Sequence, residues 1–291
     1  MKKTILFTGG SGLVGTDLVE QLLKDSSNTV ISTDISGQID QYLDVRDKSA
    51  MQNLYAKYNF NQIYHLAGLL SVGSEKNPDL AWEVNLGGLK NILDTARETN
   101  VQVFWPSSIA AFAPTTIYGA AKVAGELLCQ YYFLKYGLDV RSLRYPGLIA
   151  WKSPPGDGTT EYSVHIFHEA LKHGHYTCFL SEKTRLPMMY IDDAIAGTFA
   201  LMQAPKKKIS VRTSYNFSAI NFTPQELVTE IQKIMPDFSC DYSPDHRQVI
   251  ADSWPQNIDD STARQDWGWQ HKFDLSKLVA IMFKNLKLKY V

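Results

Sequence analysis

The chain has 291 residues, of which 44% are apolar and 20% are charged, so it can bury a full α/β core with a smaller region added. Its formal net charge of -1 provides no basic field for nucleic acid or for an anionic membrane surface. The first residues show no signal or transit peptide, and no segment approaches the roughly 18 unbroken apolar residues of a membrane span. The three cysteines are widely separated, which fits a reducing compartment, and we expect a cytoplasmic protein.

Short apolar runs alternate with amphipathic stretches through the first half of the chain. The predicted strands are Thr4–Thr8, Val30–Thr33, Gln62–Leu66, Val101–Trp105 and Val140–Arg144, and the predicted helices are Leu13–Leu23, Leu80–Thr99 and Tyr118–Tyr136. Parallel strands need crossover connections, which helices usually provide. The alternation therefore predicts an α/β fold with a doubly wound parallel sheet of the Rossmann type.

The alternation of strands and helices breaks up after about Pro146. Segments rich in proline and glycine, such as SPPGDGTTEY, separate further predicted helices at Ser163–His173, Asp192–Gln203 and Pro224–Met235. Such loops beside a sheet domain suit a ligand-covering role. We expect residues 151–291 to form mainly a small C-terminal substrate-binding lobe, partly interleaved with the sheet.

A glycine-rich turn joins the first predicted strand to the first predicted helix. Gly9, Gly12 and Gly15 stand in a GxxGxxG pattern. This pattern allows a tight turn, close approach of the backbone to a pyrophosphate, and close packing of helix on strand. The free N–H groups where the helix begins, at Leu13, favour bound phosphate. The sequence therefore predicts that residues 1–150 bind a dinucleotide.

Asp34 closes the second predicted strand, 19 residues after Gly15. A carboxylate at this place accepts hydrogen bonds from the adenosine ribose hydroxyls and repels a 2′-phosphate, so we expect NAD rather than NADP. A plain turn residue at the end of a strand is the alternative for Asp34.

Two later segments are expected to complete the nucleotide site. YLDVRD supplies Asp44 and Val45, and QIYHLAG supplies Leu66, Ala67 and Gly68 at the end of another predicted strand. Small or apolar residues there let a cofactor lie across the sheet edge. These are the expected positions of the adenine pocket and the centre of the dinucleotide.

Tyr118 and Lys122 stand four residues apart in a predicted helix, so both side chains lie on one face. A free phenol has a pKa near 10 and is a poor base at neutral pH unless nearby positive charge stabilises the phenolate. Lys122 and an oxidised nicotinamide supply such charge. Ser108, at the end of a predicted strand, can donate to the same substrate oxygen, with Ser107 as the alternative for this role. The sequence predicts a catalytic group of Ser108, Tyr118 and Lys122.

The motifs TGGSGLVG, HLAG, VNLGG around Asn85, SSIAAF, YGAAK and RYPGLI, with Asp34, resemble the extended short-chain dehydrogenase/reductase family over nearly the whole chain. The later segments WKSPPGDGTTEY, FLSEKTRLPMMYIDDAI and IADSWPQNIDDSTARQDWGW resemble its L-threonine 3-dehydrogenase branch, the one that is similar to UDP-galactose 4-epimerase. The resemblance implies NAD-dependent oxidation of the threonine β-hydroxyl to 2-amino-3-oxobutyrate, with Tyr118 as the base and hydride transfer to NAD. It also implies that Tyr145, Pro146 and Leu148 line the nicotinamide pocket.

Polar residues in loops are the candidates for gripping a small substrate alongside Ser108 and Tyr118. They are Ser71, Thr159, Thr160 and Thr184, together with Trp254. Arg185 could pair with the substrate carboxylate, but an ordinary surface arginine is the better interpretation. Four histidines at residues 165–175 have HxxH and HxH spacings, but no cysteine or carboxylate pattern completes a site, and we expect no metal.

Two other functions share the same motifs. One is a sugar-nucleotide epimerase or dehydratase that keeps its cofactor bound, and the other is a dinucleotide-sensing module without turnover. By family analogy we expect a homodimer and functional coupling to a lyase that consumes 2-amino-3-oxobutyrate.

The connections Ser108–Tyr118 and Asp34–Asp44 are shorter than is usual for the family. They are either genuine deletions or loops that are missing from this sequence.

Overall fold

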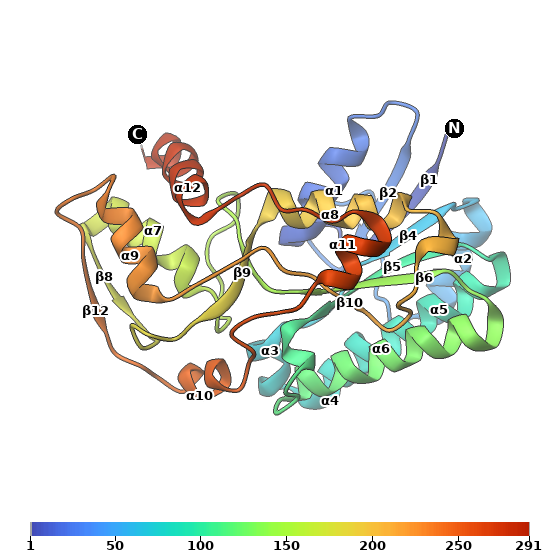
Figure 1. Cartoon of the computed structure of the whole chain (residues 1–291). Coiled ribbons are helices and arrows are strands. Elements are labelled where there is room, and N and C mark those ends of the chain that lie inside the picture. Colours follow the sequence, from blue (N-terminus) through green and yellow to red (C-terminus); the bar gives the residue numbers. More distant parts are fainter. Residues whose placement is uncertain (1, 291) are drawn as a thin grey trace. The chain divides into compact units, whose positions relative to one another are not determined.

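The computed structural model describes residues 2–290 (Figure 1), which fall into two compact units. The first unit contains residues up to Arg144 with the segments Thr198–Tyr215 and Gln265–Gly268. The second contains Tyr145–Gly197 and Asn216–Arg264 with the segment from Trp269 onward. The chain therefore passes between the units several times. Among residues 2–290 there is no helix with the length and apolar character to cross a membrane.

A seven-stranded sheet has the order β10-β6-β5-β4-β1-β2-β3. Its strands are β1 (Thr4–Thr8), β2 (Thr29–Asp34), β3 (Gln41–Tyr42), β4 (Gln62–His65), β5 (Gln102–Ser108), β6 (Val140–Tyr145) and β10 (Tyr215–Asn216). β1 pairs in parallel with both β2 and β4, and the pairs β2–β3 and β4–β5 are also parallel. The chain order reverses between β1 and β4, which is the topological switch point where ligands of such sheets bind. The predicted doubly wound Rossmann fold is confirmed.

The helices of the first unit cover the sheet, with α1 above it in Figure 1 and α5 and α6 side by side below it. They are α1 (Leu13–Leu23), α2 (Lys48–Lys57), α3 (Ser71–Lys76), α4 (Pro78–Trp82), α5 (Gly88–Thr99) and α6 (Ile117–Tyr136), with short 3-10 turns at Ile109–Ala111 and Lys206–Lys208. Apolar side chains from β1, β4, β5, α2, α5 and α6 share one buried core. This core holds in place the carboxyl ends of the strands, where the candidate site lies.

The prediction of one helix over Leu80–Thr99 is wrong in detail. A helix α4 ends at Trp82, a π-helical turn occupies Glu83–Gly87, and α5 then begins at Gly88. The apolar periodicity continues through all three segments, which is why they read as a single helix. The wider π turn places buried Asn85 against the loop after β4, where its side chain bonds the backbone of Leu69. π turns of this kind often occur at functional sites.

The second unit has two small sheets of its own, β11-β9-β7 and β12-β8. Its strands are β7 (Gly147–Ile149), β8 (His175–Cys178), β9 (Leu186–Tyr190), β11 (Ile220–Phe222) and β12 (Ser239–Tyr242). Its helices are α7 (Tyr162–His173), α9 (Pro224–Gln232), α10 (Arg247–Asp252) and α12 (Leu275–Tyr290), while α8 (Ile191–Gln203) and α11 (Ser261–Trp267) run from this unit into the first. The helix predicted to end at Met235 ends at Gln232.

Candidate active site and nucleotide cradle

The glycine turn after β1 is packed so closely that Gly9 and Gly15 leave no space for a side chain. Gly9 has a φ of +73°, and a Cβ atom added to it would lie 2.4 Å from the backbone nitrogen of Ala67. A Cβ atom at Gly15 would lie 2.4 Å from the carbonyl oxygen of Gly9. Gly12 caps α1 without any side-chain hydrogen bond to the first-turn N–H groups, beginning at Leu13. The turn is therefore an open anion cradle at a helix N-terminus, which fits the pyrophosphate of a dinucleotide.

Asp34 ends β2 beside this cradle. Its carboxylate accepts hydrogen bonds from the Ser11 hydroxyl at 2.6 Å, from the Ser11 N–H at 3.2 Å and from the Ile35 N–H at 2.8 Å. The carboxylate is thus held against the glycine turn. Its negative charge stands where a 2′-phosphate would have to approach.

The remaining predicted nucleotide residues lie at the ends of neighbouring segments. Leu66, Ala67 and Gly68 follow β4 directly, and a Cβ atom at Gly68 would meet the Asn85 amide oxygen at 2.9 Å. Asp44 is paired with Arg46 at 2.6 Å, and Val45 belongs to the buried core. The Val45 side chain is thus committed to packing, and contact of Asp44 and Val45 with adenine stays a prediction.

Ser108 and Tyr118 come together although they lie on different elements. Ser108 ends β5, and Tyr118 stands in the first turn of α6, whose N-cap Thr116 accepts a hydrogen bond from Gly119 N–H at 3.1 Å. Burial raises the pKa of Tyr118 to about 12, while a hydrogen bond with the Ser108 hydroxyl acts to lower it. At neutral pH the phenol therefore keeps its proton unless further positive charge arrives.

Lys122 lies one turn along α6 from Tyr118. Its ammonium donates to the carbonyl oxygen of Pro106 at 2.6 Å and lies 4.7 Å from the ring centroid of Trp105 and 5.4 Å from that of Tyr118. Burial lowers the pKa of Lys122 to about 8, and the charge of Glu126 acts in the opposite direction. The ammonium thus lies over the ring of Tyr118.

A buried ion pair one further turn along α6 was not predicted. Glu126 accepts hydrogen bonds from the Arg144 guanidinium at 2.6 and 2.8 Å and from the Ser107 hydroxyl at 2.5 Å. Arg144 also lies over the ring of Phe112, at 4.8 Å. The i, i+4 spacing of Tyr118, Lys122 and Glu126 is the sequence signal that could have revealed this extension of the site.

His65 is a second residue that the sequence did not single out. It ends β4, is fully buried, and its Nδ1 atom lies 2.6 Å from the Thr8 hydroxyl. Its Nε2 atom has no hydrogen-bond partner within residues 2–290. Burial, assisted by the charge of Lys122, lowers the pKa of His65 to about 3. The imidazole is therefore neutral at physiological pH and adds no charge beside the catalytic group.

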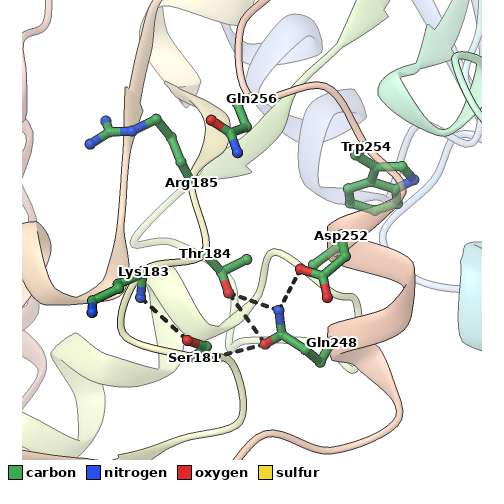
Figure 2. A pocket seen from close by; sticks show the side chains of 9 residues that line it. Ser181, Lys183, Thr184, Arg185, Gln248, Asp252, Trp254 and Gln256 are labelled. Carbon is green, nitrogen blue, oxygen red and sulfur yellow. Dashed lines mark hydrogen bonds between the residues drawn. The ribbon is translucent and has the colours of Figure 1, made fainter.

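The second unit contains a pocket of about 390 Å³, shown in Figure 2. Two of the predicted substrate residues, Thr184 and Trp254, line it together with Arg185. The Gln248 side chain, on α10, contacts Ser181, Thr184 and Asp252. Sequence reasoning missed Gln248, which carries no motif of its own. Arg185 is half-buried and is bonded to the Glu226 carboxylate at 2.5 Å and to the Asn221 side chain at 2.9 Å.

The other predicted residues are placed as follows. Ser71 begins α3, which packs on α6 in the first unit, where Glu75 accepts a hydrogen bond from the Ile117 N–H at 2.8 Å. In the second unit, Tyr145 and Pro146 lead into β7, which contains Leu148, and the Thr160 side chain packs against Gly147 beside them. Thr159 is buried next to Thr160, and neither threonine lines the pocket of Figure 2.

The four clustered histidines have separate partners. His165 contacts the Gly156 carbonyl, His168 the Tyr290 hydroxyl, His173 the Glu169 carboxylate and His175 the Ser239 hydroxyl. Among residues 2–290 there is no group of three or more histidine, cysteine or acidic side chains placed to hold a metal ion.

The model of the NAD dependent epimerase/dehydratase family matches residues 5–217, which include the glycine turn and the Ser108–Tyr118–Lys122 group. The chain belongs to this family. The family is described as NAD-dependent. The open cradle at the start of α1, with the carboxylate of Asp34 beside it, fits this cofactor.

Relatives within the epimerase/dehydratase family include both unassigned and named proteins. A Staphylococcus haemolyticus protein, called an uncharacterized epimerase/dehydratase, is 43% identical over 311 residues that cover 98% of both chains. The mitochondrial L-threonine 3-dehydrogenase of Bos taurus is 44% identical, over 97% of this chain and 82% of that protein. The crystal structure of L-threonine dehydrogenase from Phytophthora infestans has a TM-score of 0.96 at 45% identity, covering 98% of this chain and 99% of that one. The holo form of a GalE-like L-threonine dehydrogenase from Cupriavidus necator has a TM-score of 0.94 at 43% identity, covering 97% and 99%.

Each of the two short connections contains a backbone hydrogen bond. Between Ser108 and Tyr118 the chain turns with a hydrogen bond from the Thr115 N–H to the Ala113 carbonyl at 2.8 Å. Between β2 and β3, the Asp40 N–H bonds the Ser32 carbonyl at 2.9 Å. The 311 positions aligned with the Staphylococcus haemolyticus relative exceed the 291 residues of this chain, so the alignment places gaps in it. Genuine deletion and missing loops both stay predictions, which the intact mass of purified protein, compared with 32.8 kDa, separates.

Proposed function

We propose that this protein is an NAD-dependent L-threonine 3-dehydrogenase, which oxidises the β-hydroxyl of threonine to 2-amino-3-oxobutyrate. The observation that carries the proposal is the grouping of Ser108, Tyr118 and Lys122: the Lys122 ammonium lies 5.4 Å from the Tyr118 ring centroid, and Ser108 acts to lower the pKa of the same phenol. The named relatives support the choice of substrate, since L-threonine dehydrogenases match the chain from end to end at 43–45% identity.

Tyr118 acts as the general base toward the substrate hydroxyl, and Ser108 donates to the same oxygen. NAD held by the glycine cradle would supply the hydride acceptor and an additional positive charge. That charge matters because the pKa of Tyr118, at about 12, is too high for a base at neutral pH. Lys122, held by the Pro106 carbonyl, keeps a cationic group against the Tyr118 ring and is placed to bind the nicotinamide ribose.

For the substrate we propose the pocket that contains Thr184 and Trp254, in the second unit. Its size of about 390 Å³ suits a small amino acid. We also propose that Ser71, Thr159 and Thr160 contact the substrate, and that Tyr145, Pro146 and Leu148 contact the nicotinamide. No contact among the described residues decides these last six assignments.

The second candidate function is sugar-nucleotide epimerisation or dehydration, which the family description and the unassigned Staphylococcus relative favour. The two functions differ in what happens to the reduced cofactor, which an epimerase keeps and a dehydrogenase releases. The test is a steady-state assay of NADH release with NAD and threonine, serine, 3-hydroxybutyrate or UDP-sugars. Threonine-dependent release supports the proposal, whereas turnover of UDP-sugars without NADH release would replace it. Binding of NAD with no turnover of any substrate would identify a sensing module.

We further propose a homodimer formed through the outer face of α6. Leu127, Tyr131 and Leu134 lie on this face and are 58%, 50% and 72% exposed, and Trp82 on α4 is 44% exposed. An apolar surface of this kind marks a protein contact site. One solved relative is named as a monomeric L-threonine 3-dehydrogenase, so family membership alone does not imply a dimer. Light scattering of the purified protein measures its oligomeric state, and Leu134→Lys is the variant expected to disrupt the dimer. Coupling to a lyase and a cytoplasmic location stay predictions.

A further inference from the structure

The side-chain amide of Gln248 has only one possible orientation in the pocket of Figure 2. Its Oε1 atom lies 2.8 Å from the backbone nitrogen of Ser181, which can only donate. Its Nε2 atom lies 2.7 Å from Oδ1 of Asp252, whose carboxylate can only accept. Because each partner permits a single role, the oxygen of the amide must face Ser181 and the nitrogen must face Asp252. No exchange of the two atoms is compatible with both contacts.

This orientation determines the role of the Thr184 hydroxyl. The Nε2 atom has two hydrogens, of which Asp252 takes one, and the other is directed at Oγ1 of Thr184 at 2.8 Å. The hydroxyl therefore acts as an acceptor toward Gln248. Its own proton has a longer contact available, to the Gln248 Oε1 atom at 3.2 Å, and that oxygen already accepts from Ser181. A ligand oxygen in the pocket can take over this proton at little cost.

The cations around the same pocket are already paired. The Arg185 guanidinium points away from the Gln248 cluster in Figure 2 and is bonded to Glu226 at 2.5 Å and to the side chain of Asn221 at 2.9 Å. Lys183 is exposed and lies 3.6 Å from the carboxylate of Glu182. Thr184, by contrast, is 8% exposed and lines the pocket. The buried hydroxyl is thus the donor whose proton is free to turn toward a ligand.

We propose that Gln248 is a positioning residue that orients the Thr184 hydroxyl as a hydrogen-bond donor to the carboxylate of an α-amino acid substrate. This inference rests on the proposed function and deepens it, because it assigns the carboxylate rather than the ammonium group to Thr184. The pocket would then select zwitterionic amino acids over alcohols that lack a carboxylate.

The test compares steady-state kinetics of the full-length protein and its Gln248→Met variant, which keeps the side-chain length and removes the amide. Loss of one hydrogen bond to a charged group predicts a rise of about ten- to a hundredfold in KM for threonine. kcat and the KM for NAD should stay within about twofold. Gln225→Met makes the same chemical change at an exposed position on α9 outside the pocket, and its constants should match those of the wild type.

A double-mutant cycle separates positioning from a general loss of structure. Thr184→Val alone and Thr184→Val combined with Gln248→Met should have the same KM for threonine, because Gln248 acts only through Thr184. Thermal unfolding of each variant shows whether it folds. Additive increases in KM would overturn the inference, as would an unchanged KM in folded Gln248→Met.

A substrate without the carboxylate provides the last comparison. 1-Amino-2-propanol should be oxidised much more slowly than threonine by the wild type, and its kcat/KM should be unaffected by Gln248→Met. Equal losses for both substrates would contradict the assignment of the carboxylate to Thr184. Wild-type protein that releases no NADH with threonine would overturn the proposed function, and this inference with it. Wild-type turnover with threonine and no selective effect of the variants would overturn the inference alone.

Discussion

The Ser107 hydroxyl donates a 2.5 Å hydrogen bond to the buried carboxylate of Glu126, whereas the adjacent Ser108 hydroxyl accepts from the Ala110 N–H at 3.3 Å and acts to lower the pKa of Tyr118. Alternation along β5 sends the two side chains to opposite faces of the strand. Ser107 is therefore committed to the ion pair that Glu126 forms with Arg144. This commitment of Ser107 supports the proposal that Ser108, and not Ser107, donates to the substrate oxygen.

The two serines should respond differently to alanine. Ser108→Ala should lower kcat by about 10² or more, because a donor to the reacting oxygen is lost, with little change in thermal stability. Ser107→Ala should mainly lower stability, by about 1–3 kcal/mol, since the buried carboxylate loses a partner. Paired measurements of kcat and urea unfolding check this. If Ser107→Ala proved to be the more damaging variant for kcat in folded protein, the roles would have to be exchanged.

Removal of the phenol oxygen tests the base directly. Tyr118→Phe should bind NAD with unchanged affinity while kcat falls by about 10²- to 10⁴-fold, the range of general acid–base catalysis. Single-turnover measurement of NADH formation, with NAD binding followed by tryptophan fluorescence as the control, gives both quantities. Retained turnover would remove Tyr118 from the mechanism.

Glu126 should influence the pH dependence of activity through Lys122. The ammonium of Lys122 has a pKa lowered to about 8 by burial, and the Glu126 charge raises it. Activity that needs the charged Lys122 is present below this pKa and is lost as the pH rises through it. Glu126→Gln should therefore move the basic limb of the kcat/KM profile to lower pH. The variant should also lose about 1–3 kcal/mol of stability, because the buried side chain no longer carries the charge that pairs with Arg144.

An unchanged basic limb in folded Glu126→Gln would show that Glu126 serves only the Arg144 ion pair. Glu230→Gln in the second unit, where the half-buried carboxylate pairs with exposed Lys233, is the matched control. Its pH profile should equal that of the wild type.

Two glycines with similar backbone angles should differ in their tolerance of alanine. Gly9 and Gly137 have φ values of +73° and +71°, so either substitution carries a strain of about 1 kcal/mol. A Cβ atom at Gly9 also comes within 2.4 Å of the Ala67 backbone, whereas nothing lies within 4 Å of a Cβ atom at Gly137. Gly9→Ala should therefore abolish NAD binding measured by calorimetry, and Gly137→Ala should leave it unchanged. Similar NAD affinities in the two variants would mean that the glycine turn can shift to admit a Cβ atom at Gly9 without weakening NAD binding.

Asp34 should decide between the two nicotinamide cofactors. Asp34→Ser removes the proposed acceptor of the ribose hydroxyls and the charge that repels a 2′-phosphate. The variant should lose affinity for NAD and gain relative activity with NADP, as measured by the ratio of kcat/KM for the two cofactors. Because Asp34 also holds Ser11, Ser11→Ala is the control for a merely structural effect. If the ratio of kcat/KM for NAD and NADP changed equally in Asp34→Ser and Ser11→Ala, the role of Asp34 would be to hold the turn and not to select the cofactor.

The sequence alone was enough to determine the fold and to identify the candidate catalytic residues. Short apolar runs alternating with amphipathic helices leave few arrangements other than a parallel sheet covered on both faces. The glycines of the cradle could be recognised because their roles depend on local backbone geometry, as the φ of Gly9 shows. Tyr118 and Lys122 could be paired because four residues make one turn of a helix.

Only the tertiary structure decided what depends on contacts between distant segments. The bond from Ser107 to Glu126 crosses from a strand to a helix, and the Gln248 amide joins α10 to the turn at Ser181, 67 residues away along the chain. The π turn around Asn85 escaped prediction because one extra residue in a turn leaves the apolar pattern nearly unchanged. Periodicity reports which face of an element is buried, whereas the hydrogen bonds of a buried polar group depend on which side chains the folded chain brings against it.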